Sequence, residues 1–201
     1  MQTVLIASFL FDATDIGTTV FFPLLQEGFM VKAQVGGSMA DMLREQFGLS
    51  STYIEDRIRT AFLDGRPVDD FETAIISDGS TVALSAAMPG LVGATFRRGG
   101  LLAPFRNTIT HSSSDTGTKV QSGFVTIKLF NVLAREIGAT FLKQGIFVGT
   151  QAAKRFFIMQ PDIFWKACKE ALIDSQKLCV EQLAGVIGLD REGLVLIRLV
   201  L

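Results

Sequence analysis

The sequence predicts an α+β protein, with a small mixed sheet in its N-terminal half and a mainly helical C-terminal half that ends in a strand. Apolar residues make up 48% of the 201 residues and charged residues 19%, which is enough for a sizeable buried core. Strand-like runs surround one helix-like segment in the first half, and apolar side chains recur at three- and four-residue steps in the second. Such a pattern indicates a sheet with helices packed on one face.

Charge and hydropathy argue against a nucleic-acid-binding, membrane-bound or secreted protein. The net charge is -1 and the isoelectric point about 5.9, so there is no electrostatic case for binding nucleic acid or an anionic membrane. No run reaches the ~18 uncharged apolar residues of a membrane-spanning helix, and the start lacks the basic region of a secretory signal. Cys168 and Cys179 suit a reducing compartment. We therefore expect a cytoplasmic protein whose high mean hydropathy, +0.38, reflects a dense core or an oligomer interface.

The first elements are two strands and a helix. Residues 2–11 and 29–35 are rich in branched and aromatic side chains and predict strands. Ser38 followed by Asp41 is a helix-start pattern, and Gly48 suits the left-handed end of a helix. The helix is expected between these signals, whereas the segment that joins the two strands is left unassigned.

Two turn signals divide the next strands. Residues 60–63 predict a strand that is closed by the Asp64–Gly65 turn and followed by a returning segment. Residues 81–86 alternate as a further strand after the Asp78–Gly79 turn. The order is therefore strand, strand, helix, strand, turn, strand.

The second half has a different character. Residues 107–123 are rich in Ser, Thr and Gly, without apolar periodicity, and predict a linker or exposed loop. An apolar stripe over residues 125–141 predicts a helix, and Pro161–Asp162 begins another whose apolar positions continue to residue 183. The final LVLIRLVL predicts a strand. The expected parts are a first domain over 1–106, a linker over 107–123 and an α-rich extension over 124–201.

Four stretches follow one another in the order and spacing of a known family. They are VKAQVGGSMADMLREQFG, TAFLDGRPVDD, SDGSTVALSAAMPG and the RRGG of residues 97–100. Together they resemble the sulfur-carrier proteins of the ubiquitin-like, β-grasp class, whose nearest relatives are the small subunit of molybdopterin synthase and the thiamine-biosynthesis sulfur carrier. The resemblance covers about half of the chain and implies a β-grasp fold for residues 1–106.

The resemblance also implies a chemistry for the Gly-Gly pair. In the family, an activating enzyme of the E1 type adenylates the carboxylate of the last glycine, and sulfur replaces the adenylate to give a thiocarboxylate. Gly100 would carry that group and Gly99 would give the tail its flexibility. Phe96, Arg97 and Arg98 would dock on the activating enzyme or on a cofactor-synthase subunit. No cofactor is implied.

The chain departs from the family because Gly100 is internal and has no carboxylate to adenylate. The segment MPGLVGATFR also lengthens the path from the last predicted strand to the Gly-Gly pair. One hypothesis is a sulfur-carrier precursor that a protease cuts after Gly100. The alternative is a non-catalytic module for oligomerisation or partner binding, in which Gly99–Gly100 is a hinge. Neither hypothesis makes the protein an enzyme.

The inserted segment contains Pro89, Gly90 and Gly93, which predict a tight bend. The alternative is a surface on which the missing side chains let a ligand or a partner backbone approach closely. The bend is the favoured interpretation.

Other reactive residues give weaker patterns. His111 with Ser112 and Asp115 could suggest a catalytic triad, but triads assemble in space, so a surface-loop histidine is expected. One histidine and two distant cysteines do not have the spacing of a metal site. On one continuous helix Cys168 and Cys179 would stand roughly 16 Å apart, too far for a disulfide, so both are expected in the core.

Overall fold

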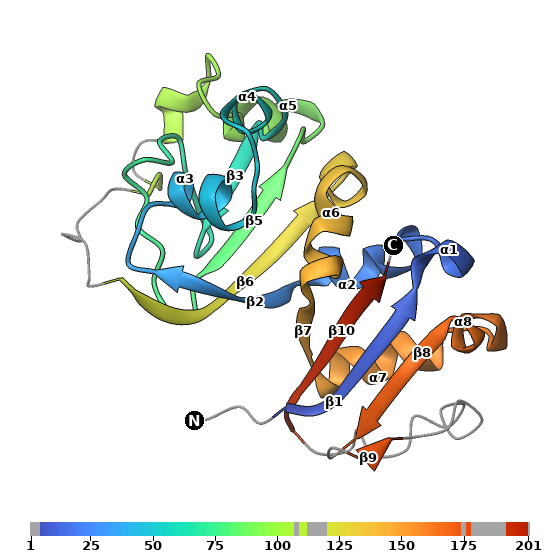
Figure 1. Ribbon diagram of the computed structural model, residues 1–201. Coiled ribbons are helices and arrows are strands. Elements are labelled where there is room, and N and C mark those ends of the chain that lie inside the picture. Colours follow the sequence, from blue (N-terminus) through green and yellow to red (C-terminus); the bar gives the residue numbers. More distant parts are fainter. Residues whose placement is uncertain (1–4, 107–108, 112–119, 174–175, 178–191, 201) are drawn as a thin grey trace. The chain divides into compact units, whose positions relative to one another are not determined.

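The computed structural model describes residues 5–106, 109–111, 120–173, 176–177 and 192–200 (Figure 1). The chain divides into two compact units. The central unit is Met30–Glu136, and the terminal unit combines Met1–Phe29 with Ile137–Leu201. Helices and a mixed sheet are both present, so the predicted α+β class is confirmed.

The terminal unit is built on strands from both ends of the chain. They are β1 (Leu5–Asp12), β7 (Ile146–Gly149), β8 (Cys168–Ile173), β9 (Gln176–Lys177) and β10 (Leu194–Val200). Their order is β7-β10-β1-β8-β9. β1 runs parallel to β10 and antiparallel to β8, so the first strand lies between two strands of the second half. The predicted domain boundaries at residues 106 and 123 rest on changes in composition along the chain. The strand pairings instead place the two ends of the chain in one unit.

Short helices and an aromatic cluster complete this unit. Phe9 and Phe11 of β1 are buried, with ring centroids 4.8 Å from Phe157 and 4.6 Å from Phe164, respectively. Phe164 in turn meets Trp165 edge-on at 5.4 Å. Such contacts add stability beyond the area they bury. The helices are α1 (Ala13–Ile16), the 3-10 turn η1 (Thr19–Phe21), α2 (Phe22–Glu27), α7 (Thr150–Ile158) and α8 (Asp162–Lys166).

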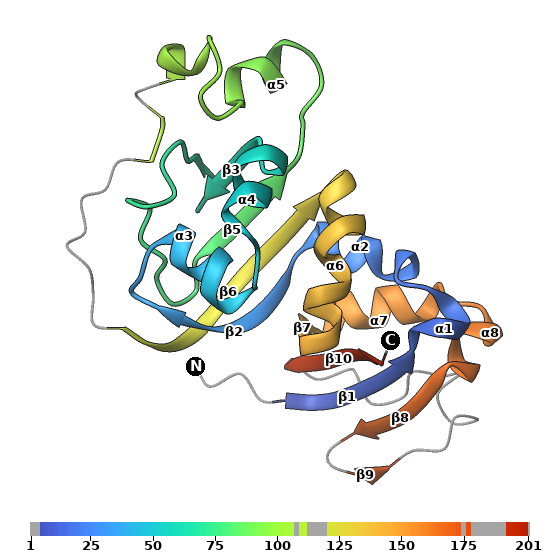
Figure 2. The ribbon, with the colours of Figure 1, turned by 45° about the horizontal axis from the view of Figure 1, so that its top comes forward.

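The central unit contains the strands of the predicted first domain except β1, which belongs to the terminal unit. It also contains β6 (Gln121–Phe130), which comes from the second half of the chain. Its strands are β2 (Phe29–Val35), β3 (Thr60–Leu63), β4 (Arg66–Pro67), β5 (Thr81–Ser85) and β6. Their order is β4-β3-β5-β6-β2. β3 is antiparallel to β4 and β5, whereas β5 and β6 are parallel. β2 runs in the opposite direction to β6 (Figures 1 and 2).

The first helix of the central unit begins where its sequence signal indicates. Ser38 Oγ accepts a hydrogen bond from the Asp41 backbone N–H at 3.1 Å and donates to Asp41 Oδ2 at 2.7 Å, so the predicted cap is confirmed. Both views show α3 and α4 against β3 and β5 (Figures 1 and 2). The helices are α3 (Met39–Asp41), its π-helical continuation η2 (Met42–Gln46), α4 (Ser51–Arg57), α5 (Gly90–Phe96) and the 3-10 turn η3 (Ala103–Arg106). α6 (Val132–Gln144) begins in this unit and ends in the terminal unit.

The predicted strands over residues 29–35, 60–63 and 81–86 are confirmed, with the last ending at Ser85. Asp64 and Gly65 have positive φ values, 49° and 78°, as a tight hairpin turn requires. Local turn chemistry therefore predicts this part of the central unit correctly.

The prediction of a mainly helical second half is wrong in two places, where the chain forms strands. Residues 121–130 form β6, in which Val125, Ile127 and Leu129 alternate as fully buried side chains, and the helix begins only at Val132. Residues 168–173 form β8 instead of continuing a helix, so the 16 Å helical separation from Cys179 does not apply. Cys179 and the end of that predicted helix lie outside the described residues. Cys168 is buried as expected, and burial raises the pKa of its thiol to about 11.

Among the described residues, no helix is long and apolar enough to cross a membrane.

Candidate functional site

The RRGG motif lies on a segment that follows β5, which we call the arm (residues 86–106). The arm contains α5 and η3, and in Figure 2 it stands out from the strands of the central unit. Four large apolar side chains of the arm face solvent: Leu91, Val92, Leu101 and Phe105 are 76%, 58%, 97% and 83% exposed. Single exposed apolar residues are ordinary, but four on one short segment indicate a surface that binds something.

A buried arginine holds the base of the arm. Arg106 is 3% exposed, and its two terminal nitrogens pair with the Asp69 carboxylate at 2.6 and 2.9 Å. Its Nε donates to the Thr95 carbonyl at 2.8 Å, and one terminal nitrogen also donates to Thr110 Oγ1 at 2.9 Å. This forked contact is the strong, geometrically specific form of an arginine–carboxylate pair. The arm is therefore fixed to the central unit at its C-terminal end.

Gly99 and Gly100 form an ordered turn. The Gly100 N–H donates to the Arg97 carbonyl at 3.1 Å, and Gly99 has a φ of 62°. This is a four-residue β-turn with a positive φ at its third position, where glycine is favoured. Gly99 is exposed, whereas Gly100 is partly covered. The Gly-Gly pair thus lies in the connection between β5 and β6 rather than at a chain end.

The three predicted docking residues differ in their surroundings. Phe96 packs against Phe62 with ring centroids 5.3 Å apart. The Arg98 guanidinium lies 4.3 Å above the Phe71 ring, and burial lowers the pKa of Arg98. Arg97 is the one of the three that is exposed. Its guanidinium is therefore available to a ligand or partner, whereas Phe96 and Arg98 fasten the arm to the central unit.

Gly93 explains the bend of the arm. A Cβ at this position would lie 1.8 Å from the Met88 carbonyl oxygen, and the Gly93 N–H donates to the Pro89 carbonyl at 3.3 Å. Gly90, at the start of α5, has a φ of 71°. The close approach that these glycines allow is between two parts of the chain itself, as the bend interpretation expects.

Two hollows lie along the arm and share part of their lining. The first has a volume of about 300 Å³ and the second of about 540 Å³, and Arg59, Ala94 and Arg97 line both. Gly99 and Gly100 line the second. Arg59 has no sequence signal of its own, because only packing brings the end of α4 beside the arm.

A third hollow is apolar. It has a volume of about 270 Å³ and lies between β3, β5, the end of β6 and the start of the arm, and its apolar lining comes from Phe62, Ala83, Leu84, Met88, Pro89 and Phe130. The Asn131 side chain closes one end by donating to the Ala87 carbonyl at 2.5 Å and to Ser85 Oγ at 3.1 Å. A site of this composition holds apolar groups and offers no acid or base for catalysis.

Of the His111, Ser112 and Asp115 pattern, the structure describes only the histidine. The His111 backbone N–H donates to the Pro67 carbonyl at 2.8 Å, and Ser112 and Asp115 lie outside the described residues. In the part of the chain that the structure describes, no group of three His, Cys, Asp or Glu side chains is placed to hold a metal.

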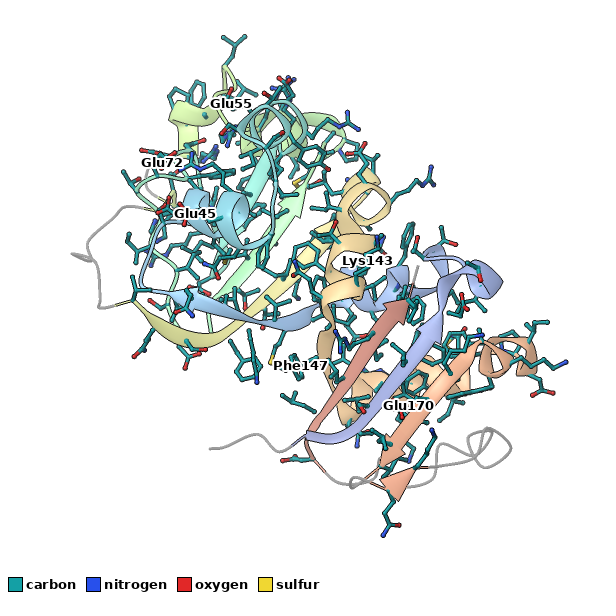
Figure 3. The ribbon with its side chains drawn as sticks, in the orientation of Figure 1. Glu45, Glu55, Glu72, Lys143, Phe147 and Glu170 are labelled. Atoms are coloured by element: carbon teal, nitrogen blue, oxygen red, sulfur yellow. The ribbon has the colours of Figure 1, made fainter. Side chains whose placement is uncertain are left out.

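Two polar clusters of the central unit are structural. Tyr53 Oη donates to Glu136 Oε2 at 2.8 Å, and Arg57 also pairs with Glu136, which lowers the pKa of that carboxyl and joins α4 to α6. Arg44 bridges Asp41 and Glu72 at 3.3 and 2.7 Å. Figure 3 shows Glu72 with other acidic side chains on the side of α3 and α4.

Comparisons with known proteins give no relative from which a function could be transferred. No protein-family model, no curated protein and no solved structure matches the chain. The functional argument therefore depends on the arm and on the hollows beside it.

Proposed function

We propose that the protein is a non-catalytic binding module, in which a β-grasp-like central unit presents the arm to a second copy of the same chain. The observation that carries this proposal is the exposure of Leu91, Val92, Leu101 and Phe105 on one ordered segment. The arm is ordered because Arg106 and Gly93 fix it, so little conformational entropy is lost when it binds.

Support for a β-grasp-like unit comes from its strand order. In the β-grasp arrangement, the first and last strands lie parallel at the centre of the sheet, and the third strand lies antiparallel beside the last. Here β5 and β6 are the parallel central pair, β3 borders β5, and β2 and β4 are the outermost of the five strands of this unit. The two orders agree if β6 takes the place of the family's first strand. We therefore infer a circularly permuted relative of the fold, in which β1 has no part.

The choice of a second copy as partner depends on area and charge. Phe105, an aromatic side chain of a kind that buries roughly 150–250 Å², is 83% exposed, and Leu91, Val92 and Leu101 add to its apolar surface. An apolar patch of this kind marks an interface, to which each partner contributes ~800 Å² at standard size. The net charge of -1 gives two copies little mutual repulsion.

Sedimentation velocity of the full chain over a range of concentrations tests this proposal. We expect a reversible dimer whose dissociation constant rises at least tenfold, about 1.4 kcal/mol, in the double variant Leu101→Ser with Phe105→Ser. Ile163→Ser is the matched control, because Ile163 is also exposed, at 63%, but lies in the terminal unit. A monomer at every concentration, or a double variant that dimerises like the wild type, would contradict the proposal.

A processed sulfur carrier is the second candidate. In the permuted fold, β5 takes the place of the family's last strand, so the Gly-Gly pair follows the strand that a carrier tail would follow. Exposure of Gly99 would also allow a protease to reach the arm. A cut after Gly100 would create the carboxylate that an activating enzyme could adenylate. A chain end at Gly100 in protein isolated from its own cells would support this candidate.

A further inference from the structure

The cationic lining of the two shared hollows has no role in the proposed apolar docking. Arg59 is half-buried between α4 and β3, and Arg97 follows α5. Within the described parts of the chain, neither guanidinium makes a hydrogen bond or an ion pair. Both side chains line the hollow of about 300 Å³ and the hollow of about 540 Å³.

A third arginine adds to the positive charge of the larger hollow. Arg98 also lines it, and the like charge of Arg59 contributes to lowering the pKa of Arg98 after the larger effect of burial. Glu55 and two aspartates act on Arg98 in the opposite direction. Figure 3 shows Glu55 on the α4 side of the central unit, and Asp69 is engaged by Arg106. The larger hollow is therefore lined by the unpaired guanidinium groups of Arg59 and Arg97 and by Arg98, whose guanidinium packs on the Phe71 ring.

The remaining lining says what kind of ligand fits. Ala86, Ala87, Met88 and Ala94 line the smaller hollow together with two glycines, so its wall is compact and mostly apolar. The volumes fall within or near the ~300–1,000 Å³ of small-molecule sites. Guanidinium groups bind phosphate and carboxylate oxygens through paired N–H donors.

We infer that these hollows form a binding site for a phosphorylated small molecule, with its phosphate between Arg59 and Arg97. A phosphate monoester carries about -1.5 to -2 charges at neutral pH and matches two guanidinium groups. A single carboxylate would leave one of the two without a counter-charge. The apolar wall would receive the body of the ligand.

Isothermal titration calorimetry of the full chain with inorganic phosphate at constant ionic strength tests the site. We expect saturable binding in the millimolar range, weakened at least tenfold in Arg59→Gln and in Arg97→Gln, and much weaker binding of acetate. Arg135→Gln is the matched control, because Arg135 is exposed on α6 of the same unit and lines neither hollow. The dissociation constant of the control should equal that of the wild type.

Three results would overturn the inference. They are the absence of saturable phosphate binding, equal affinity in the wild type and both arginine variants, and acetate binding as tight as that of phosphate. Circular dichroism of Arg59→Gln excludes misfolding as the cause of a loss, and the exposed Arg97 gives an independent second variant. Leu101 also lines the larger hollow, so the two proposals are separated by the arginine variants. Arg59→Gln and Arg97→Gln keep all four exposed apolar residues of the arm, so we expect both variants to sediment like the wild type whether or not they bind phosphate.

Discussion

A chain that ends at Gly100 is expected not to fold on its own. Such a fragment lacks β6, which lies between β5 and β2 and buries Val125, Ile127 and Leu129 completely. Removing the bulk of one such side chain costs about 2–5 kcal/mol, and a whole domain has only about 5–15 kcal/mol of stability. β1 would also lose both of its neighbours, because β8 and β10 follow Gly100 in the chain.

Circular dichroism and amide hydrogen exchange on residues 1–100 alone test this expectation, and co-expression with residues 101–201 is the control. We expect the isolated fragment to lack a cooperative unfolding transition and the co-expressed pair to recover protected amides. Cooperative unfolding of residues 1–100 alone would show that β6 is dispensable. It would also make a separate carrier domain feasible.

Gly93→Ala is expected to destabilise the central unit by about 3 kcal/mol. The new Cβ would lie 1.8 Å from the Met88 carbonyl oxygen, and backbone atoms cannot yield as the end of a flexible side chain can. For a chain of this length, the loss corresponds to a fall in Tm of roughly 6–12 °C in differential scanning calorimetry.

Gly37→Ala provides the comparison for this change. Gly37 lies in the same unit, and a Cβ there would be 3.9 Å from Asp41 Oδ2, an ordinary contact. We expect its Tm to stay within about 2 °C of the wild type, since substitutions away from such features change stability by about 0.5 kcal/mol or less. Equal Tm values for the two variants would mean that the bend of the arm does not depend on Gly93.

Local signals predict those parts of the fold in which the structure is decided over a few residues. Ser38 and Asp41 cap a helix, and Asp64–Gly65 closes a hairpin, because the side chains and φ values involved are neighbours in the chain. The final run of branched apolar residues is a strand, as its own composition predicts. Its pairing with β1 could not be predicted, because nothing local to either end records that partner.

The misassigned β6 has a specific physical cause. Val125, Leu129, Val132 and Leu133 fit a helical spacing, whereas Val125, Ile127 and Leu129 fit a strand spacing equally well. The neighbouring strands β5 and β2, between which this segment lies with one face fully buried, decide for the strand, and this is a property of the sheet, not of the segment.

The candidate site was predictable only in part. The RRGG motif predicts functional residues on what the structure shows to be the arm, and one of them, Arg97, is exposed. Arg59 and Arg106 could not be singled out, because their roles come from the hollow and from the Asp69 carboxylate that packing brings to them. Arg98 belongs to this motif and Phe96 directly precedes it, yet both side chains pack against aromatic rings.

The central claim is that the arm works as a surface of an uncut chain, and peptide mapping by mass spectrometry of protein from its own cells tests it most directly. The account predicts that the peptide spanning Gly100 and Leu101 is recovered intact, without a species that ends at Gly100. A chain end at Gly100, above all one heavier by the exchange of oxygen for sulfur, would contradict the account. It would instead identify the protein as a processed sulfur carrier.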